Sequence, residues 1–384
     1  MKIGIDARML GPGFGLARYV QQLVLHLQKI DYENQYVLFM RSGNWDRFYP
    51  EQDNFKKVLA EIPWYSVSEQ TKFPEIIQKE GVDLMHFPHW NVPLLYRGPC
   101  VVTVHDLIMY HYPRQEATTL GPLGYWFKDK MARLVIRNAV KKAQTILATS
   151  EFTRQDIHQT LGVPVERMLV TYQAPFDEER GKGDVGRGKI TETLILKKYG
   201  IDKPYVLYVG AAYPHKNLEG LLQAWKLFQE KYGETYQLIF VGADNFFYKK
   251  LIHSSVCKES SNIIFTGFVE DSELTVLYEY AWLYVFPSLY EGFGLPPLEA
   301  MTHGVPVVSS NRSCMPEVLG DAALYFDPEN YEQMSEVMHT GLTNIDMQLE
   351  LQQNAREHLK LFSWKKLAKE TLGIYERISG KNIK

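Results

Sequence analysis

The chain has 384 residues, more than one hydrophobic core usually supports, so we expect two domains. Apolar residues make up 45% and charged residues 23%, as in ordinary globular proteins, and the net charge of -3 provides no basic excess for holding nucleic acid. The cysteines number three and are widely spaced, which argues against a disulfide framework or a zinc cluster and fits a reducing compartment.

The sequence contains no segment with the features of a leader or a membrane span. The first expected strand begins at Lys2, which leaves no room for a signal peptide. No apolar run approaches the ~18 residues that a transmembrane helix needs. We therefore expect a cytoplasmic protein without membrane-spanning segments.

The first part of the chain alternates apolar strands with amphipathic helices. A strand over residues 2–7 leads through the glycine-rich turn at 11–15 into a helix over 16–30. Such a turn lets the backbone approach a ligand, but its spacing is not the dinucleotide fingerprint, and a plain tight turn fits equally well. Further strands are expected over 36–40, 56–61, 82–87, 100–105, 145–148 and 168–172, with helices over 68–80, 125–142 and 151–161.

Two of these strands end in polar or aromatic side chains. His86, His89 and Trp90 stand at the exit of strand 82–87, where α/β sheets bind ligands, but they lack the third well-spaced ligand of a zinc site. His105 and Asp106 follow the next strand. A histidine in such a place is more often a hydrogen-bonded structural residue than a catalytic one.

The helix expected over residues 125–142 carries six basic residues and one acidic residue. Its apolar residues recur with helical spacing, so one face packs inward. The basic face is either simply solvated or rests on anionic lipid headgroups, aided by Trp126 and Phe127. The sequence does not choose between these two interpretations.

A change in composition predicts the domain boundary. Residues 174–190 are rich in glycine and charge and have few apolar anchors, as in a linker. We therefore expect a first domain over 1–173 and a second over 191–363. The second part again alternates, with strands over 205–210, 237–242, 263–267, 283–287, 305–309 and 323–326, and helices over 191–199, 218–231 and 298–303 and in three segments from 331 onward.

Lys216 and two glutamates stand at the strand ends of this second part. Lys216 lies in the turn after strand 205–210, where an ammonium group can neutralise a phosphate. Glu291 leaves strand 283–287 and Glu299 lies about a turn into the next helix, so backbone amides at 292–295 face an anion at a helix N-terminus. A bare pair of glutamates would be solvated surface carboxylates; the Gly-Phe-Gly-Leu-Pro-Pro between them indicates a nucleotide-sugar site.

The stretch EGFGLPPLEAM, with GVPVV after it, resembles the retaining glycosyltransferases of family 4, which have the GT-B fold. The resemblance covers nearly the whole chain. It implies two Rossmann-like parallel-sheet α/β domains that face a cleft, with the C-terminal helix (364–384) crossing back to the first domain. It also implies roles for individual residues. Glu291 contacts the transferred sugar, the run Gly292, Phe293, Gly294 and Leu295 contacts the sugar and phosphates, and Glu299 contacts the ribose. His105 lies beneath the donor sugar, Gly13 and Gly15 line the phosphate region, Phe268 flanks the nucleobase, and Asp106, His89 and Trp90 contact the acceptor.

The turn after residue 210 departs from the family pattern. There the family has an arginine and a lysine that both hold the phosphates. Lys216 matches the lysine, but position 211 is alanine and position 215 is histidine. His215 or Arg18 in the first helix is a candidate for the second positive charge.

The resemblance implies a retaining hexosyltransferase with His105, Lys216 and Glu291 as its catalytic residues. The Pro-His-Lys-Asn turn and the opening IDARML are similar to bacterial surface-polysaccharide mannosyltransferases, which favours GDP-mannose over a UDP-sugar as donor and a glycan or lipid-linked acceptor. No aspartate cluster suited to magnesium is evident, so we expect no metal and no cofactor. A GT-B epimerase or phosphorylase stays open, as does a silent sugar-binding homologue, suggested by the missing arginine.

Overall fold

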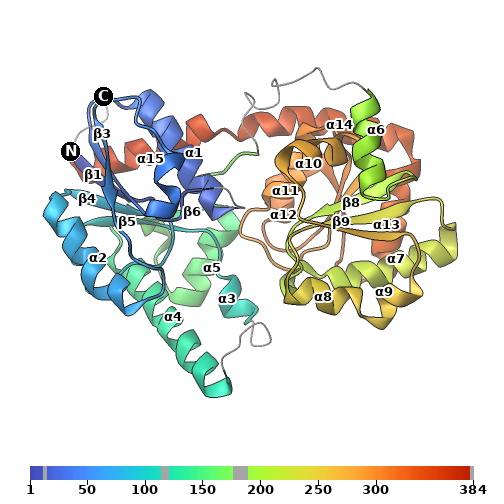
Figure 1. Cartoon of the computed structure of the whole chain (residues 1–384), viewed down its shortest axis with the longest axis horizontal. Helices are drawn as coiled ribbons and strands as arrows, with labels where there is room; N and C mark the ends of the chain where they lie inside the picture. Colours follow the sequence, from blue (N-terminus) through green and yellow to red (C-terminus); the bar gives the residue numbers. More distant parts are fainter. Residues whose placement is uncertain (12–14, 114–120, 176–188, 381–384) are drawn as a thin grey trace. The chain divides into compact units, whose positions relative to one another are not determined.

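The computed structural model describes residues 1–11, 15–113, 121–175 and 189–380 (Figure 1). The chain divides into two compact units. The first unit comprises Met1–Tyr110, Thr118–Gln173 and Ser363–Lys384, and the second comprises His111–Ala117 and Ala174–Phe362. Most of the expected linker, residues 176–188, lies outside the described part of the chain.

The first unit is built on a parallel sheet with the strand order β3-β2-β1-β4-β5-β6-β7. Its strands are β1 (Lys2–Asp6), β2 (Gln35–Met40), β3 (Phe55–Leu59), β4 (Leu84–Phe87), β5 (Cys100–Val104), β6 (Thr145–Ala148) and β7 (Met168–Val170). Its helices are α1 (Leu16–Ile30), α2 (Val67–Glu80), α3 (Ile108–His111), α4 (Pro122–Lys142), α5 (Glu151–Leu161) and α15 (Trp364–Ile378), with 3-10 turns at Ser42–Arg47 and Val165–Arg167. All the strands expected from the sequence are present, within two residues at each end.

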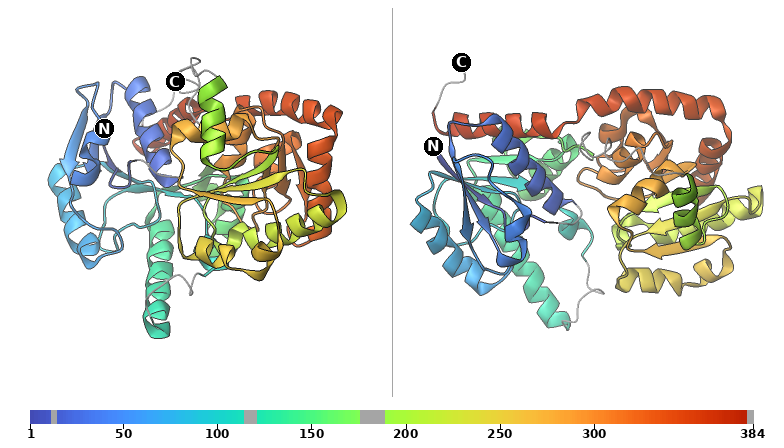
Figure 2. Two further views of the ribbon diagram at one scale, coloured as in Figure 1. Left: turned by 45° about the vertical axis from the view of Figure 1, so that its right-hand side comes forward. Right: turned by 45° about the horizontal axis from the view of Figure 1, so that its top comes forward.

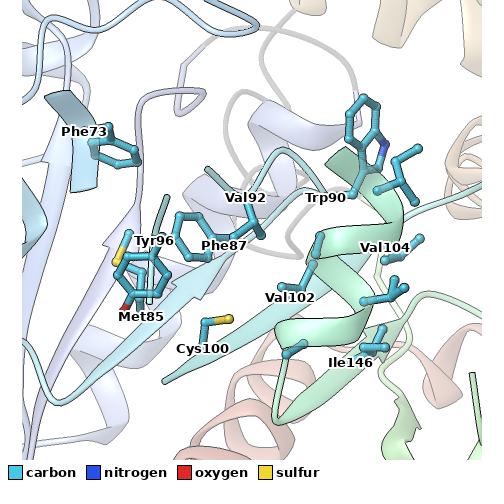
Figure 3. Close-up of a cluster of buried hydrophobic side chains, with 14 of the residues drawn as sticks. Phe73, Met85, Phe87, Trp90, Val92, Tyr96, Cys100, Val102, Val104 and Ile146 are labelled. Carbon is cyan, nitrogen blue, oxygen red and sulfur yellow. The ribbon is translucent and has the colours of Figure 1, made fainter. Parts of the chain in front are cut away.

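Both faces of this sheet are covered, because the strands are apolar on both sides. One face forms a buried cluster with α2, α4 and α5, to which Phe73, Ile136 and Ile157 contribute. Figure 3 shows part of this cluster, including Phe73. The other face is covered by α1 and α15, which lie side by side (Figure 2). The C-terminal helix therefore crosses back to the first unit, as the resemblance implied.

The second unit repeats this plan with the strand order β10-β9-β8-β11-β12-β13. Its strands are β8 (Tyr205–Val209), β9 (Gln237–Val241), β10 (Ile263–Gly267), β11 (Leu283–Phe286), β12 (Val307–Ser310) and β13 (Ala323–Phe326). Its helices are α6 (Lys189–Lys198), α7 (Leu218–Tyr232), α8 (Phe246–Ile252), α9 (Ser255–Glu259), α10 (Asp271–Glu279), α11 (Leu295–Thr302), α12 (Met315–Leu319), α13 (Tyr331–Thr343) and α14 (Ile345–His358), with 3-10 turns at Pro214–Lys216, Gly320–Ala322 and Leu359–Leu361.

Each sheet has one point where the strand order reverses. The reversal falls between β1 and β4 in the first unit and between β8 and β11 in the second. Connections leave such a pair of strands in opposite directions, which opens a crevice outside their carboxyl ends. The residues that follow these four strands are therefore the first to examine for ligand binding.

Two expectations from the sequence need correction. The helix expected over 298–303 begins three residues earlier, at Leu295, because prolines at positions 296 and 297 fit a first helical turn. His86 does not stand at the exit of its strand: it lies within β4, is fully buried, and bonds through Nδ1 to the Tyr375 hydroxyl at 2.5 Å and through Nε2 to the Thr103 hydroxyl at 2.9 Å. His86 joins the sheet to α15.

Candidate functional site

Lys216 and Glu291 meet at the strand-order reversal of the second unit. Lys216 ends the 3-10 turn after β8, and Glu291 lies on the loop after β11. The Lys216 Nζ atom donates to Glu291 Oε1 at 2.6 Å, with only 16% and 8% of the two side chains exposed. The sequence predicted that both residues lie on one side of the sheet, but not that they form an ion pair.

Backbone hydrogen bonds fix the two loops that carry this pair. The Leu289 N–H donates to the His215 carbonyl at 2.8 Å, so the turn after β8 is joined to the loop after β11. The Glu291 N–H donates to Ser313 Oγ at 3.0 Å, and Ser313 itself has a left-handed φ of 54°. A left-handed backbone at a non-glycine residue is strained and persists where its surroundings hold it. Ser313 was not predicted, and nothing in the local sequence marks it.

A left-handed glycine and two prolines define the start of α11, where the sequence predicts an anion site. Gly294 caps the helix with φ 86°, and a Cβ atom there would lie 2.4 Å from Met315 Cε, so only glycine fits. The next two residues after Leu295 are prolines without N–H groups. The amides at 292–295, which the sequence predicts to face an anion, lie ahead of the prolines.

Glu299 lies within α11 and is held by a residue that the sequence analysis missed. Its side chain is buried, and the Tyr278 hydroxyl of α10 donates to Glu299 Oε2 at 3.3 Å. Tyr278 in turn stacks on His303 with an interplanar angle of 3°. The Glu299 carboxylate is therefore fixed in orientation within α11.

The remaining donor-side residues of this unit have different environments. The side chains of Phe293 and Leu295 belong to the core, with Phe293 packed edge-on against Phe362 at 5.8 Å, so only their backbone can face a ligand. Phe268 follows β10 and is 58% exposed. In the sheet, β9 and β8 separate its strand from β11, which places Phe268 toward one side of the site.

His215, a candidate for the second positive charge, is almost fully buried among aromatic rings. It is 1% exposed, and its imidazole stacks on Tyr213 with ring centroids 5.9 Å apart. Tyr112, from the segment that joins α3 to α4, lies 6.1 Å from His215 and 6.0 Å from Tyr290. These aromatic neighbours were not predicted. Arg18, the other candidate, belongs to α1 of the first unit.

His105 lies in the first unit, directly after β5, in a tightly bonded setting. Its Nε2 atom lies 2.9 Å from the Pro88 carbonyl and its Nδ1 atom 3.2 Å from Gln173 Nε2. Because a carbonyl only accepts, Nε2 carries the proton and Nδ1 accepts from the Gln173 amide. Desolvation lowers the pKa of His105 to about 4, so the imidazole is neutral near pH 7. The His105 side chain is therefore fixed in orientation and uncharged.

The expected acceptor residues also lie at the carboxyl edge of the first unit's sheet. His89 and Trp90 follow β4, with ring centroids 4.5 Å apart, and His89 Nδ1 bonds to Asn91 Oδ1 at 3.0 Å. Asp106 Oδ1 accepts the Ile108 N–H at 2.9 Å at the start of α3. Gly15 caps α1 with φ 63°, whereas Gly13 lies outside the described residues.

The whole chain has the fold of a known structure. It superposes on sucrose-phosphate synthase from Thermosynechococcus elongatus with a TM-score of 0.74 at 19% sequence identity, covering 99% of this chain and 100% of that one. At this identity the likeness concerns the fold alone. Together with the two doubly wound parallel sheets, it defines the GT-B class.

Sequence comparison identifies the family. Residues 15–174 match the model described as Glycosyltransferase Family 4, and residues 192–358 match Glycosyl transferases group 1. The chain is 31% identical to the O-antigen chain mannosyltransferase B of Escherichia coli over 301 residues, 76% of this chain and 74% of that protein. It is 30% identical over 282 residues to the serotype-specific mannosyltransferase WbdA of Escherichia coli, spanning 72% of this chain and 33% of that protein. The chain belongs to the family 4 glycosyltransferases.

Proposed function

We propose that this glycosyltransferase moves a mannosyl residue from GDP-mannose to a hydroxyl group of a glycan or lipid-linked acceptor, with retention of configuration and without a metal ion. The observation that carries the proposal is the Lys216–Glu291 pair at the carboxyl edge of β8 and β11. It places one cation and one carboxylate beside the amides at 292–295. A nucleoside diphosphate sugar requires a cation beside its diphosphate and a carboxylate beside its sugar hydroxyls, which this pair provides.

The chemistry follows from the charge that develops when the sugar–phosphate bond breaks. Negative charge builds up on the departing diphosphate, where Lys216 Nζ and the amides ahead of α11 stabilise it. Lys216 can turn from Glu291 to the phosphate, which frees Glu291 to accept hydrogen bonds from the sugar. Because the lysine supplies positive charge at the leaving group, the reaction has no need of a bound metal. The departing phosphate then takes the acceptor proton on the same face of the sugar, which gives retention.

The choice of mannose and of a surface polysaccharide rests on the relatives. Both curated proteins compared above are mannosyltransferases, one of them named for O-antigen chains. The opening IDARML and the Pro-His-Lys-Asn turn support the same choice.

The donor is tested by melting-temperature shifts and turnover with GDP-mannose, UDP-glucose and ADP-glucose. We expect GDP-mannose at a hundredfold excess over its Kd to stabilise the protein by about 2.7 kcal/mol. With an acceptor, it should yield a product whose anomeric configuration matches the donor. If another nucleotide sugar gave larger stabilisation and turnover, that compound would be the donor in place of GDP-mannose. An isomerised sugar would indicate an epimerase, and nucleotide-sugar binding without any turnover would indicate a silent binding protein.

We further propose that α4 rests on an anionic membrane surface, at the cytoplasmic side of the membrane that carries a lipid-linked acceptor. In the part of the chain that the structure describes, no helix is long and apolar enough to span a membrane. The start of α4 nevertheless extends beyond the other helices of its unit (Figures 1 and 2). One exposed stripe at helical spacing combines apolar residues near the start of α4 with basic residues farther along: Leu123, Trp126, Phe127, Lys130, Leu134, Arg137 and Lys141.

Replacing Lys130, Arg137 and Lys141 by glutamine is expected to reduce binding to anionic vesicles, because each basic residue near such a surface contributes about 1 kcal/mol. Arg133 and Lys142 are poor targets, since Arg133 pairs with Asp129 at 2.7 Å and Lys142 donates to the Leu94 carbonyl at 2.6 Å. The measurement is co-sedimentation with vesicles of increasing phosphatidylserine content and increasing salt.

The matched control removes the same charge elsewhere in the first unit, by replacing the exposed Lys72, Lys79 and Lys365 with glutamine. This control should bind like the unchanged protein. Equal binding to neutral and anionic vesicles, or an equal loss in both triple variants, would identify α4 as ordinary solvated surface.

A further inference from the structure

Tyr65, which the sequence analysis did not mark, is connected to residues that follow β1 and β4, the two strands at the strand-order reversal of the first unit. It lies between β3 and α2 with a left-handed φ of 58°, and its side chain is 61% exposed. A bulky aromatic residue rarely adopts this conformation, because its Cβ atom crowds the following carbonyl group. Because the ring is exposed, its neighbours leave room for the backbone of Tyr65 to turn to a less strained conformation. Something must therefore hold Tyr65 in place.

A buried network of charges does so. Arg8, directly after β1, forms two hydrogen bonds with Asp6, at 2.8 and 2.7 Å, and its guanidinium also donates to Glu69 Oε1 at 2.7 Å. The other carboxylate oxygen, Glu69 Oε2, accepts the Tyr65 N–H at 2.7 Å. Asp6, Arg8 and Glu69 are all almost fully buried. The strained residue is thus anchored through its own backbone to an ion network in the interior.

The same network reaches the loop after β4. Asn91 Nδ2 donates to Glu69 Oε1 at 2.9 Å, and Asn91 Oδ1 contacts His89 Nδ1 at 3.0 Å. Trp90 belongs to the buried cluster shown in Figure 3. Its ring also packs against that of Tyr65, with ring centroids 5.7 Å apart. One set of buried charges therefore positions an exposed aromatic ring and the aromatic group that supports it.

Buried ion networks are a poor way to gain stability, because desolvation of the charges offsets their attraction. Such a network is better explained by the geometry it imposes. Here that geometry is a ring tied through Glu69 to Arg8, which follows β1, and packed on Trp90, which follows β4. In a doubly wound sheet, ligands bind outside the carboxyl ends of such a pair of strands.

Asp106 adds a carboxylate to the group formed by Tyr65 and Trp90. The Tyr65 hydroxyl is protonated near pH 7, because the pKa of a tyrosine is about 10, so this hydroxyl can donate. Asp106 Oδ1 accepts the Ile108 N–H, and a carboxylate has further lone pairs for ligand hydroxyls. An aromatic face beside a hydroxyl acceptor suits a pyranose, which has an apolar C–H face and a polar edge.

We propose that Tyr65, supported by Trp90 and held by the Arg8–Glu69 network, is the stacking platform for the terminal pyranose ring of the acceptor, with Asp106 receiving one of its hydroxyls. This inference rests on the proposed function and makes it more specific. The acceptor group is a sugar ring bound by its face, rather than a lipid phosphate bound by its charge.

The test measures the binding of methyl α-D-mannopyranoside to the full chain without donor, by saturation-transfer NMR titration. Tyr65→Ala is expected to weaken this binding about tenfold, on the scale of one aromatic contact. Tyr65→Phe keeps the ring and should stay within about twofold. Tyr65→Gly removes both the ring and the backbone strain, so it should bind as weakly as Tyr65→Ala without a lower melting temperature. The control, Tyr32→Ala, removes an equally exposed tyrosine from the opposite edge of the sheet and should change nothing.

Steady-state transfer to a mannoside acceptor provides the second measurement. Tyr65→Ala should raise the acceptor KM about tenfold and leave both kcat and the donor KM within about twofold. Unchanged pyranoside binding in Tyr65→Ala, or binding of glycerol phosphate in preference to the pyranoside, would overturn the inference while leaving the donor chemistry intact. Loss of transfer with every nucleotide sugar would count against the proposed function instead. The pyranoside titration would still decide the role of Tyr65.

Discussion

Replacing Glu291 by alanine is expected to lower kcat/KM for sugar transfer by about a hundredfold to a thousandfold, with little change in the affinity for GDP. Glu291 is buried, paired with Lys216 at 2.6 Å and held by its own N–H on Ser313, so it is organised before the donor binds. The loss corresponds to about 2.7–4 kcal/mol, the scale of one preorganised polar contact in a transition state. In the proposed function the nucleotide is held elsewhere, by Lys216, by Glu299 and by the amides ahead of α11, so we expect its affinity to persist.

The measurements are transfer kinetics and GDP titration of the same preparations. Glu291→Gln is the informative companion, because it keeps the shape and one acceptor oxygen while removing the charge. Glu259→Ala is the control, since it removes an exposed glutamate that pairs with Lys226 at 2.8 Å in the same unit, and surface pairs contribute little. Near-normal transfer by Glu291→Ala would refute the assignment. A parallel fall in GDP affinity would place Glu291 at the phosphates instead.

Replacing Lys216 by alanine is expected to weaken the binding of GDP about tenfold to a hundredfold and to slow transfer as well. Its ammonium group lies beside the start of α11, where the leaving diphosphate would carry charge. Affinity for guanosine, which has no phosphates, should stay within about twofold. Calorimetric titration with both ligands makes the comparison, and Lys226→Ala is the matched control. Equal losses for GDP and guanosine would mean that Lys216 does not contact phosphate.

The ion pair also affects stability, so folding must be separated from function. Lys216→Ala leaves the Glu291 carboxylate without its partner, and breaking a buried pair in this way costs about 3–5 kcal/mol at most. The double variant Lys216→Met with Glu291→Leu removes both charges and should recover much of that loss in urea unfolding. It should remain inactive. Recovery of activity together with stability would show that the pair has only a structural role.

Much of this architecture follows from local patterns in the sequence. Residues 205–209 are all buried in β8, as an uninterrupted apolar run predicts for a parallel strand with both faces covered. The helix α1 has the predicted bounds, because its apolar spacing begins directly after a glycine-rich turn. The loop from Glu291 to Glu299 was recognisable because its glycines and prolines restrict the backbone to a strand exit followed by a helix start.

The contacts that organise the sites depend on which strands become neighbours. Lys216 and Glu291 are 75 residues apart and pair because β8 and β11 are adjacent in the sheet. The same holds for Arg8 and Glu69, which are 61 residues apart and together hold Tyr65 in a conformation that tyrosine does not favour. Local periodicity sets the strands and helices, since it depends on neighbours along the chain. Ion pairs, buried histidines and strained residues depend on packing between distant segments, so only the tertiary structure could decide them.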